Sequence, residues 1–318
     1  YGKSNKMRFN LCILFHNKRE GENMRNIKTD FADESIQQTI EKEDYKLVKK
    51  QYGKVTLTHV EILKKNRKIN KDVGHYISLD FETLQDEKDR KQISEVLLKA
   101  LHQMVKISDN DKILIVGLGN SDIVADSLGP SVADKIVVTN HLFKLFPSQV
   151  DKDLRRVCVF TPKVMGQTGL ESSDLIKAIV KLFNPNLIIA IDSLASSSVK
   201  RINKVIQINN TGIHPGSGIG NFRKPLNQQV LKVPVIAIGV ATVVSAEKIV
   251  EEAFVQFANQ AKIKVTAKKK QQILNDILSH RSLQMVVTPK EIDEDIEYLS
   301  TIIATSLNQF VHHDLSNV

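Results

Sequence analysis

From residue 112 onward, short apolar runs alternate with segments whose apolar residues recur at helical spacing. The apolar runs are rich in β-branched residues and span Ile113–Gly117, Val157–Thr161, Leu187–Asp192, Val205–Ile208 and Val233–Gly239. Runs with so few polar positions are typical of strands that are covered on both faces. The pattern therefore predicts a central sheet with helices packed against it.

Helical spacing marks the segments between these runs. Both Ser172–Phe183 and Ser245–Ala261 show it, and the second begins with a serine suited to cap a helix. Upstream, two strands and a helix are expected at Thr56–Leu63, His75–Phe81 and Asp89–Val105. Because strands and helices alternate, we expect an α/β fold, a three-layer sandwich with a mostly parallel central sheet and helices on both faces.

The two ends of the chain differ in pattern. A Lys- and Gln-rich helical stretch follows Ala261, and Asp293–Phe310 reads as a terminal amphipathic helix with an acidic first turn. Residues 1–28 lack periodicity, and we expect an N-terminal extension or pro-segment there; the part before Met24 is either a removable arm or not native. Residues 29–318 are expected to form a single α/β domain.

Composition excludes several classes of protein. The 318 residues are 42% hydrophobic, which is enough to bury a sizeable core and argues against a disordered chain. The cysteines Cys12 and Cys158 form no CxxC pair and no metal-type spacing, which fits a reducing, intracellular setting. The apolar run Leu11–Phe15 is too short for a secretory signal or a membrane span.

The net charge of +9 raises the question of nucleic-acid binding. Basic residues cluster at Lys64–Lys68 and Lys268–Lys270, but no aromatic residues interleave with them as stacking platforms. Solvated helix faces or loops explain such clusters more often than nucleic acid does. A basic surface would equally attract an acidic protein substrate.

The stretch GLGNSDIVADSLGP, from Gly117 to Pro130, lies where a phosphate-binding turn would be found. The third glycine of a GxGxxG fingerprint would fall on Asp122, whose carboxylate would repel phosphate, and no Walker sequence follows. The stretch instead presents Asp126 in a strand-to-helix loop at the carboxyl end of a strand.

A second carboxylate, Asp192, follows the apolar run of LIIAIDSL. An ionised carboxylate there is unfavourable unless it is paired, so it is either a site residue or a turn cap. Parallel topology would bring the loops of Asp126 and Asp192 to one sheet edge. Two neighbouring carboxylates do not both ionise easily, so one pKa rises and the pair can act as acid and base on a water. That arrangement is typical of a hydrolase.

Two loops contain further candidates. In TGIHPGSGIGNFRK, a serine-nucleophile motif GxSxG around Ser217 fails at Pro215, and we favour His214 as a substrate contact or a hydrogen-bonded loop residue over a metal ligand. In TPKVMGQTGLESS, Gln167 and Thr168 either hydrogen-bond a peptide backbone or only form a turn.

Taken together, these stretches resemble the germination protease family of spore-forming bacteria. The resemblance is carried by GLGN with DSLGP (117–130), TPKVMGQTGLES (161–172), LIIAIDSLASSS (187–198), IQINNTGIHPGSGIGNFRK (206–224), VPVIAIGVATVV (233–244) and MVVTPKEID (285–293). It extends upstream through GHYISL at Gly74 to KTDFA at Lys28. Several long motifs in the same order make the match specific.

The resemblance implies an endopeptidase that begins the degradation of small acid-soluble spore proteins during germination. Asp126 and Asp192 match the two essential aspartates of the family. The implied supporting residues that hold the peptide are His214, Gly216, Ser217, Gly218, Gln167 and Thr168. No cofactor is expected, although a similar fold in hydrogenase maturation proteases gathers acidic residues around a metal and keeps a metal-assisted mechanism open.

The resemblance also implies a cytoplasmic enzyme of the spore core, a homotetramer with no membrane contact, made as a zymogen. Family members cut at a motif that contains Glu.

The chain departs from the family in having Val124 and Ala125 before Asp126, where the loop commonly reads TPD. If translation starts at Met24, only a few residues precede the KTDFA stretch, too few for the usual pro-segment. The competing hypotheses are a maturation-type protease and a non-enzymatic DNA-binding α/β protein.

Overall fold

The computed structural model describes residues 29–36, 42–65, 71–214, 224–263, 265–278 and 285–313. The expected N-terminal extension, residues 1–28, lies outside the described residues, so the domain boundary at residue 29 stays a prediction.

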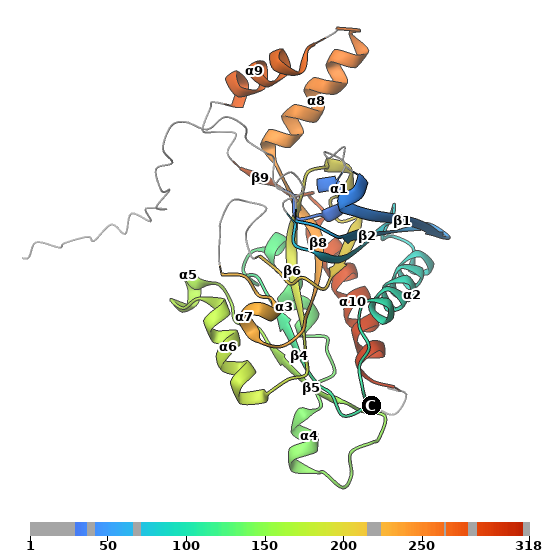
Figure 1. Cartoon of the computed structure of the whole chain (residues 1–318), viewed down its shortest axis with the longest axis vertical. Coiled ribbons are helices and arrows are strands. Elements are labelled where there is room, and N and C mark those ends of the chain that lie inside the picture. Colours follow the sequence, from blue (N-terminus) through green and yellow to red (C-terminus); the bar gives the residue numbers. More distant parts are fainter. Residues whose placement is uncertain are drawn as a thin grey trace, which may run out of the picture.

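One large mixed sheet forms the centre of the molecule (Figure 1). Its strands follow the order β1-β2-β3-β7-β8-β6-β4-β5, and β9 pairs with β8. The strands are β1 (Tyr45–Tyr52), β2 (Val55–Ile62), β3 (Gly74–Asp80), β4 (Lys112–Gly117), β5 (Arg156–Phe160), β6 (Leu187–Ser196), β7 (Val205–Asn209), β8 (Val235–Ser245) and β9 (Val286–Val287).

The sheet is parallel in one half and antiparallel in the other. Strands β5, β4, β6 and β8 are parallel neighbours, whereas β8, β7, β3, β2 and β1 pair in antiparallel fashion. The expected mostly parallel sheet therefore describes only the half that contains β5, β4, β6 and β8. The tight β1–β2 connection turns at Gly53, whose φ of +55° suits glycine, and such a short turn can join only antiparallel strands.

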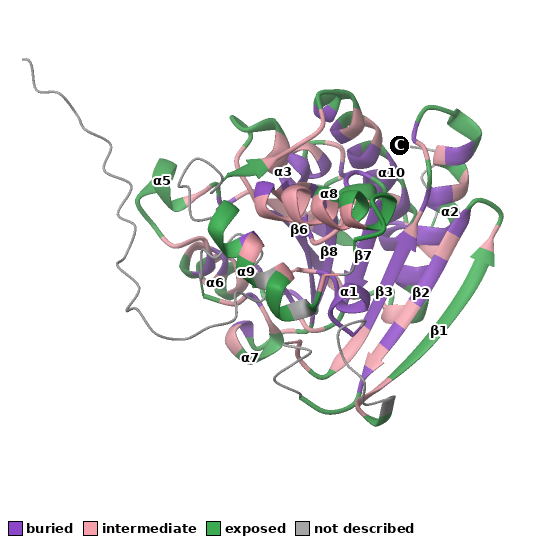
Figure 2. Cartoon of the chain, turned by 90° about the horizontal axis from the view of Figure 1, so that it is seen from above, coloured by how far each residue is buried: buried purple, intermediate pink, exposed green. Residues whose placement is uncertain are grey.

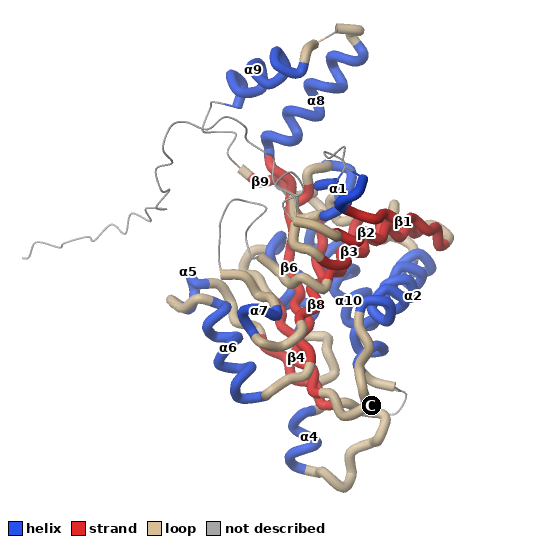
Figure 3. The backbone as a smooth tube through the Cα atoms, viewed as in Figure 1, coloured by secondary structure: helices blue, strands red, loops and turns tan. Residues whose placement is uncertain are grey.

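Helices cover both faces of the sheet, which confirms the three-layer α/β prediction (Figures 1 and 3). They are α1 (Ala32–Ile36), α2 (Glu87–Met104), α3 (Leu128–Ala133), α4 (Asn140–Leu145), α5 (Met165–Thr168), α6 (Ser172–Phe183), α7 (Gln228–Leu231), α8 (Ala246–Gln260), α9 (Ala267–Leu278) and α10 (Ile292–Val311), with the short 3₁₀ turns η1 (Lys42–Asp44), η2 (Val124–Asp126) and η3 (Val199–Arg201).

Alternation along the strands divides the core into two layers. Ile189 and Ile191 of β6 pack in the larger cluster with residues of α2, α3 and α10. Their neighbours Ile188 and Ala190 point to the opposite face and pack with residues of α6 and α7. The sheet is therefore apolar on both faces, as its continuous hydrophobic runs indicated.

Two elements at the periphery behave differently from this core. Strand β1 is largely exposed at the sheet edge (Figure 2). Helix α8 begins at Ala246 and is capped by Ser245, whose Oγ accepts a hydrogen bond from Lys248 N at 3.2 Å, and this confirms the expected cap. Helices α8 and α9 extend away from the sheet (Figure 1).

Within the described ranges, no helix combines the length and apolar character needed to cross a membrane.

Candidate active site

The site lies where β6 continues beyond the end of its neighbour β4. Gly117, the last residue of β4, pairs with Ile191, whereas β6 runs on to Ser196 alongside β8. The predicted end of this strand at Asp192 was therefore wrong, because pairing with the long strand β8 keeps the chain extended. Asp192 is the first residue of β6 beyond β4, and in the described part of the chain no strand flanks it on that side.

Three glycines let the loop after β4 fold tightly against the sheet. A Cβ on Gly117 would lie 2.3 Å from the Gly129 carbonyl oxygen, and one on Gly129 would lie 2.1 Å from the Leu118 carbonyl oxygen. Gly119 has a φ of +116°, and a Cβ there would lie 2.0 Å from the Asp126 carbonyl oxygen. The glycines of this stretch therefore bring backbone close to backbone and hold η2, which ends at Asp126, at the strand end.

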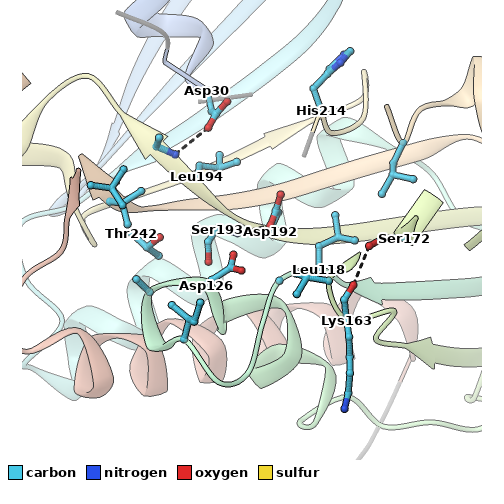
Figure 4. Close-up of a pocket in the computed structure, with 18 of the residues that line it drawn as sticks. Asp30, Leu118, Asp126, Lys163, Ser172, Asp192, Ser193, Leu194, His214 and Thr242 are labelled. Carbon is cyan, nitrogen blue, oxygen red and sulfur yellow. Dashed lines mark hydrogen bonds between the residues drawn. The ribbon is translucent and has the colours of Figure 1, made fainter. Parts of the chain in front are cut away.

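Asp126 and Asp192 line the same cavity, whose volume is about 310 Å³ (Figure 4). Asp126 comes from η2 and Asp192 from β6. The other lining residues that matter below are Asp30, Lys163, Ser172, Ser173, Ser193, His214, Lys224 and Thr242. A volume of this size is at the small end of the range for ligand sites.

The cavity reaches both faces of β6 because β4 has already ended. The side chains of Ser193 and Ile191 point to the same face of β6, which is the face covered by α3 and α10. The Asp192 side chain points to the opposite face. Asp192 is only 7% exposed, and its Oδ1 accepts a hydrogen bond from Ser193 N at 2.9 Å. The carboxylate is thus held by its own strand at the rim of an apolar core.

The segment before β1 supplies another wall of the cavity. Asp30 N donates to the Ala195 carbonyl oxygen at 3.1 Å, and Ala195 N donates to Asp30 Oδ2 at 2.9 Å (Figure 4). This pair of hydrogen bonds fixes the segment against the end of β6. Asp30 lies outside the residues that the sequence singled out as a site, because only the KTDFA resemblance pointed to it.

Glu34 anchors the same segment more deeply. Its carboxylate accepts hydrogen bonds from Ser196 Oγ at 2.7 Å, from Ser197 N at 2.8 Å and from Thr29 Oγ1, and Arg201 Nη1 lies 3.0 Å away. Burial opposes the negative charge, but the hydrogen bond from Thr29, the Arg201 charge and the serine donors outweigh it and lower the pKa of Glu34 below its ordinary value.

Arg201 joins the segment to the antiparallel half of the sheet. Its guanidinium contacts Asp33 at 2.9 Å, Glu34 at 3.0 Å and Asp80 at 2.8 Å, and it lies over the Phe31 ring. Burial opposes the charge, but attraction by Asp33, Asp80 and Glu34 outweighs it and raises the pKa of Arg201. The site wall is therefore held by a network of ion pairs centred on the Arg201 guanidinium.

Of the predicted supporting residues that the structure describes, only His214 lines the cavity. Its Nε2 lies 3.3 Å from Asp72 Oδ2. Hydrogen bonds from Lys65 and then His214 lower the pKa of Asp72 despite its partial burial. Gly216, Ser217 and Gly218 lie outside the described residues.

Gln167 and Thr168 are not among the residues that line the cavity. Gln167 Nε2 donates to Asn120 Oδ1 at 2.9 Å and to Asp122 Oδ2 at 2.8 Å, so it ties α5 to the loop that precedes Asp126. The Thr168 hydroxyl donates to the Leu170 carbonyl oxygen at 3.1 Å and stabilises a turn. A role for either in substrate binding stays a prediction.

Hydroxyl groups on the cavity wall were missed by the sequence analysis. Ser173 Oγ, Ser193 Oγ and Thr242 Oγ1 are buried and have no hydrogen-bond partner within the described part of the chain. Thr242 falls inside the apolar run VPVIAIGVATVV, where a hydroxyl looks like an ordinary strand position. Only the pairing of β6 with β8 shows that it faces the cavity.

Acidic residues at the end of parallel strands also raise the question of a metal. Among the residues that the structure describes, no three His, Cys, Asp or Glu side chains are arranged so that they would hold an ion. These described residues therefore do not fit a metal centre.

Comparison with known proteins assigns the family. A family model described as germination protease matches residues 21–260. Germination protease of Clostridium tetani is 38% identical over 274 residues, which cover 80% of this chain and 84% of that protein. The germination proteases of Clostridium acetobutylicum (37% identical, 90% and 95% covered) and Bacillus subtilis (34% identical, 83% and 85% covered) are also similar.

Among solved structures, a nickel–iron hydrogenase maturation protease from Thermococcus kodakarensis aligns with 67% of this chain and 98% of its own. The alignment has 17% identity and a TM-score of 0.33, which is too low to support an argument about this chain.

Proposed function

Because the chain belongs to the germination protease family, and is thus a peptidase of spore germination, we propose that it cleaves small acid-soluble spore proteins as an endopeptidase. In this proposal it acts in the spore core, where it begins the degradation of these proteins. The basic surface that follows from a net charge of +9 suits a substrate cut at a motif that contains Glu.

The reaction that we propose is attack of a water on the scissile carbonyl, assisted by Asp126 and Asp192 with one proton shared between them. The ionised carboxylate takes a proton from the water as the new C–O bond forms, and the protonated one gives its proton to the carbonyl oxygen. When the C–N bond breaks, the leaving nitrogen takes a proton from one carboxyl group, and the other carboxylate takes a proton from a hydroxyl of the tetrahedral intermediate as its carbonyl re-forms. The two carboxylates then return to their starting state.

One observation carries this proposal. Two carboxylates from different strand ends, Asp126 and Asp192, line one cavity at the carboxyl edge of the parallel half of the sheet. A substrate in this cavity can therefore be reached from both carboxylates, and ligands of open α/β sheets bind at this edge.

The end of β6 offers a place for the substrate main chain. Beyond Ile191, β6 has β8 on one side, while on the other side the described residues place Asp30 against Ala195 rather than a strand. An extended peptide can add its backbone to such an edge. In this proposal His214, which lines the cavity, contacts the bound peptide.

The proposal also includes the assembly and maturation of the enzyme. We propose a homotetramer that needs no cofactor and that loses a short segment just before the KTDFA stretch at Lys28 when it matures. The anchoring of residues 29–36 by Asp30 and Glu34 supports the trimming step, because it gives the mature N-terminus a fixed place beside the cavity.

The experiment is incubation of the purified chain, begun near Thr29, with a DNA-free α/β-type spore protein, with and without chelator. We expect specific fragments from the parent and from Asp134→Asn, whose carboxylate is exposed and outside the cavity, but none from Asp192→Asn. Loss of cleavage on chelation, restored by a divalent ion, would replace the two-aspartate mechanism with a metal-assisted one. No cleavage by a folded parent, with salt-dependent retention of DNA, would replace the protease with a DNA-binding protein.

A further inference from the structure

Strand β8 contains a β-bulge beside the cavity. Leu194 pairs with Ala241 and Ala195 pairs with Val243, so Thr242 is an extra residue with no partner in β6. Bulges turn a side chain away from the regular alternation and are frequent next to active sites. The backbone of the bulge is held from outside, because the Thr242 carbonyl oxygen accepts a hydrogen bond from Thr288 Oγ1 at 2.8 Å.

The Thr242 side chain is fully buried, yet its hydroxyl has no hydrogen-bond partner among the described residues. A buried hydroxyl without a partner lowers stability, so such groups usually signal a missing ligand or water. Thr242 lines the cavity that contains Asp126 and Asp192. A ligand bound in this cavity can therefore supply the hydrogen-bond partner that the Thr242 hydroxyl lacks.

Ser193 has the same property. Its Oγ is buried without a partner in the described part of the chain, and the residue lines the cavity on the face of β6 that looks toward α3 and α10. Figure 4 shows Thr242, Ser193 and Asp126 in one region of the cavity. Two unused hydroxyl donors thus accompany one of the two carboxylates.

Some of the other donors on the wall are already used. Ser172 Oγ donates to the Lys163 carbonyl oxygen at 2.9 Å, and Lys224 Nζ pairs with Asp174 at 3.0 Å. Carboxylates, when ionised, only accept hydrogen bonds. The hydroxyls of Ser173, Ser193 and Thr242 stay available among the described residues. Of these, Ser193 and Thr242 lie in the region of Asp126, so a peptide carbonyl beside that carboxylate meets them as uncharged donors.

We propose that the Thr242 hydroxyl is a catalytic group that donates a hydrogen bond to the scissile carbonyl oxygen, with the Ser193 hydroxyl as the second donor. As water adds to the carbonyl carbon, negative charge builds on this oxygen before the protonated carboxyl group has given up its proton, and donors already in place stabilise that charge. The inference rests on the proposed function and names the residues that bind the oxygen under attack.

The test compares Thr242→Val and Thr242→Ser with the parent. Each protein is expressed as the full chain, and mass spectrometry first verifies that any N-terminal trimming has finished. Valine keeps the shape of threonine and removes only the hydroxyl. We expect kcat of Thr242→Val to fall about 100-fold or more with KM nearly unchanged, as for loss of one oxyanion donor. The Thr242→Ser variant keeps the donor, so its kcat should stay within a few-fold of the parent.

Thermal unfolding separates this role from a structural one. Since the hydroxyl has no partner in the described protein, Thr242→Val should melt at the same temperature as the parent or higher. The matched control is Thr58→Val, a buried strand threonine of β2 that does not line the cavity, and its kcat should equal that of the parent.

Three outcomes would overturn the inference while the parent cleaves: an unchanged kcat in Thr242→Val, a rise of KM alone, or a lowered melting temperature with loss of activity in both Thr242 variants. A parent that does not cleave the spore protein would overturn the proposed function, and this inference with it.

Discussion

At the scale of single residues, the position of the Asp126 carboxylate depends on how closely its loop approaches the sheet. Gly119 is the critical contact, because its positive φ and the nearby Asp126 carbonyl leave no room for a side chain. The glycine pattern that resembles a nucleotide motif therefore has a different purpose here, which is to place a carboxylate.

Gly119→Ala should displace η2 and with it Asp126. We expect loss of most proteolytic activity and a fall of about 1–3 kcal/mol in the free energy of unfolding, since alanine is strained at this φ and its Cβ meets backbone. Urea unfolding and the cleavage assay measure the two effects. Gly166→Ala is the control, because a Cβ there has no atom within 4 Å, and a similar loss in that variant would refute the explanation.

At the scale of elements, residues 29–36 are held against the end of β6 by charge. The pKa of Glu34 is lowered in the folded protein, so its contribution to stability is complete above the unfolded value of about 4.3 and is lost as pH falls through the folded value.

Glu34→Gln should therefore destabilise the protein at neutral pH, by about 1–3 kcal/mol because donors to a buried carboxylate lose their acceptor. The difference between parent and variant should shrink as pH falls below about 4.3, where the parent also becomes protonated. Urea unfolding at a series of pH values measures this. A difference that does not change with pH would show that the charge of Glu34 does not hold the segment.

Most elements of the parallel half were predictable because their periodicity is strong. Ser172–Phe183 matches α6, and the strand at Leu187 was found, although it continues beyond Asp192. Strand β1 was missed because its sequence YKLVKKQY is exposed at a sheet edge and has no apolar run. The bulge at Thr242 was also beyond prediction, because it depends on the register between two strands that are distant in sequence.

At the scale of the whole molecule, a packed core on both faces of the sheet fixes the strand ends that present the aspartates. Helix α10 contributes strongly to this core, with buried residues along its length. The antiparallel half of the sheet extends this core and provides Asp80 for the network around Arg201. Its strands β2, β3 and β7 were predicted, but their antiparallel pairing was not.

Leu307→Ala tests the contribution of α10. Leu307 is fully buried, so the change should lower the free energy of unfolding by about 2–5 kcal/mol through lost burial and a cavity. Leu182→Ala, at a position that is 83% exposed, should have almost no effect on unfolding. Equal melting temperatures for the two variants would contradict the packing described here.

The central claim, that Asp126 and Asp192 act as one catalytic pair, is tested most directly by a double-mutant cycle on kcat/KM. Asp126→Asn, Asp192→Asn and the double variant are compared with the parent on the same spore protein. Residues that act as a unit are not additive, so each single change should lower kcat/KM by about 10²–10⁴ and the double change by little more. Retained activity in either single variant, or losses that multiply in the double variant, would contradict the account.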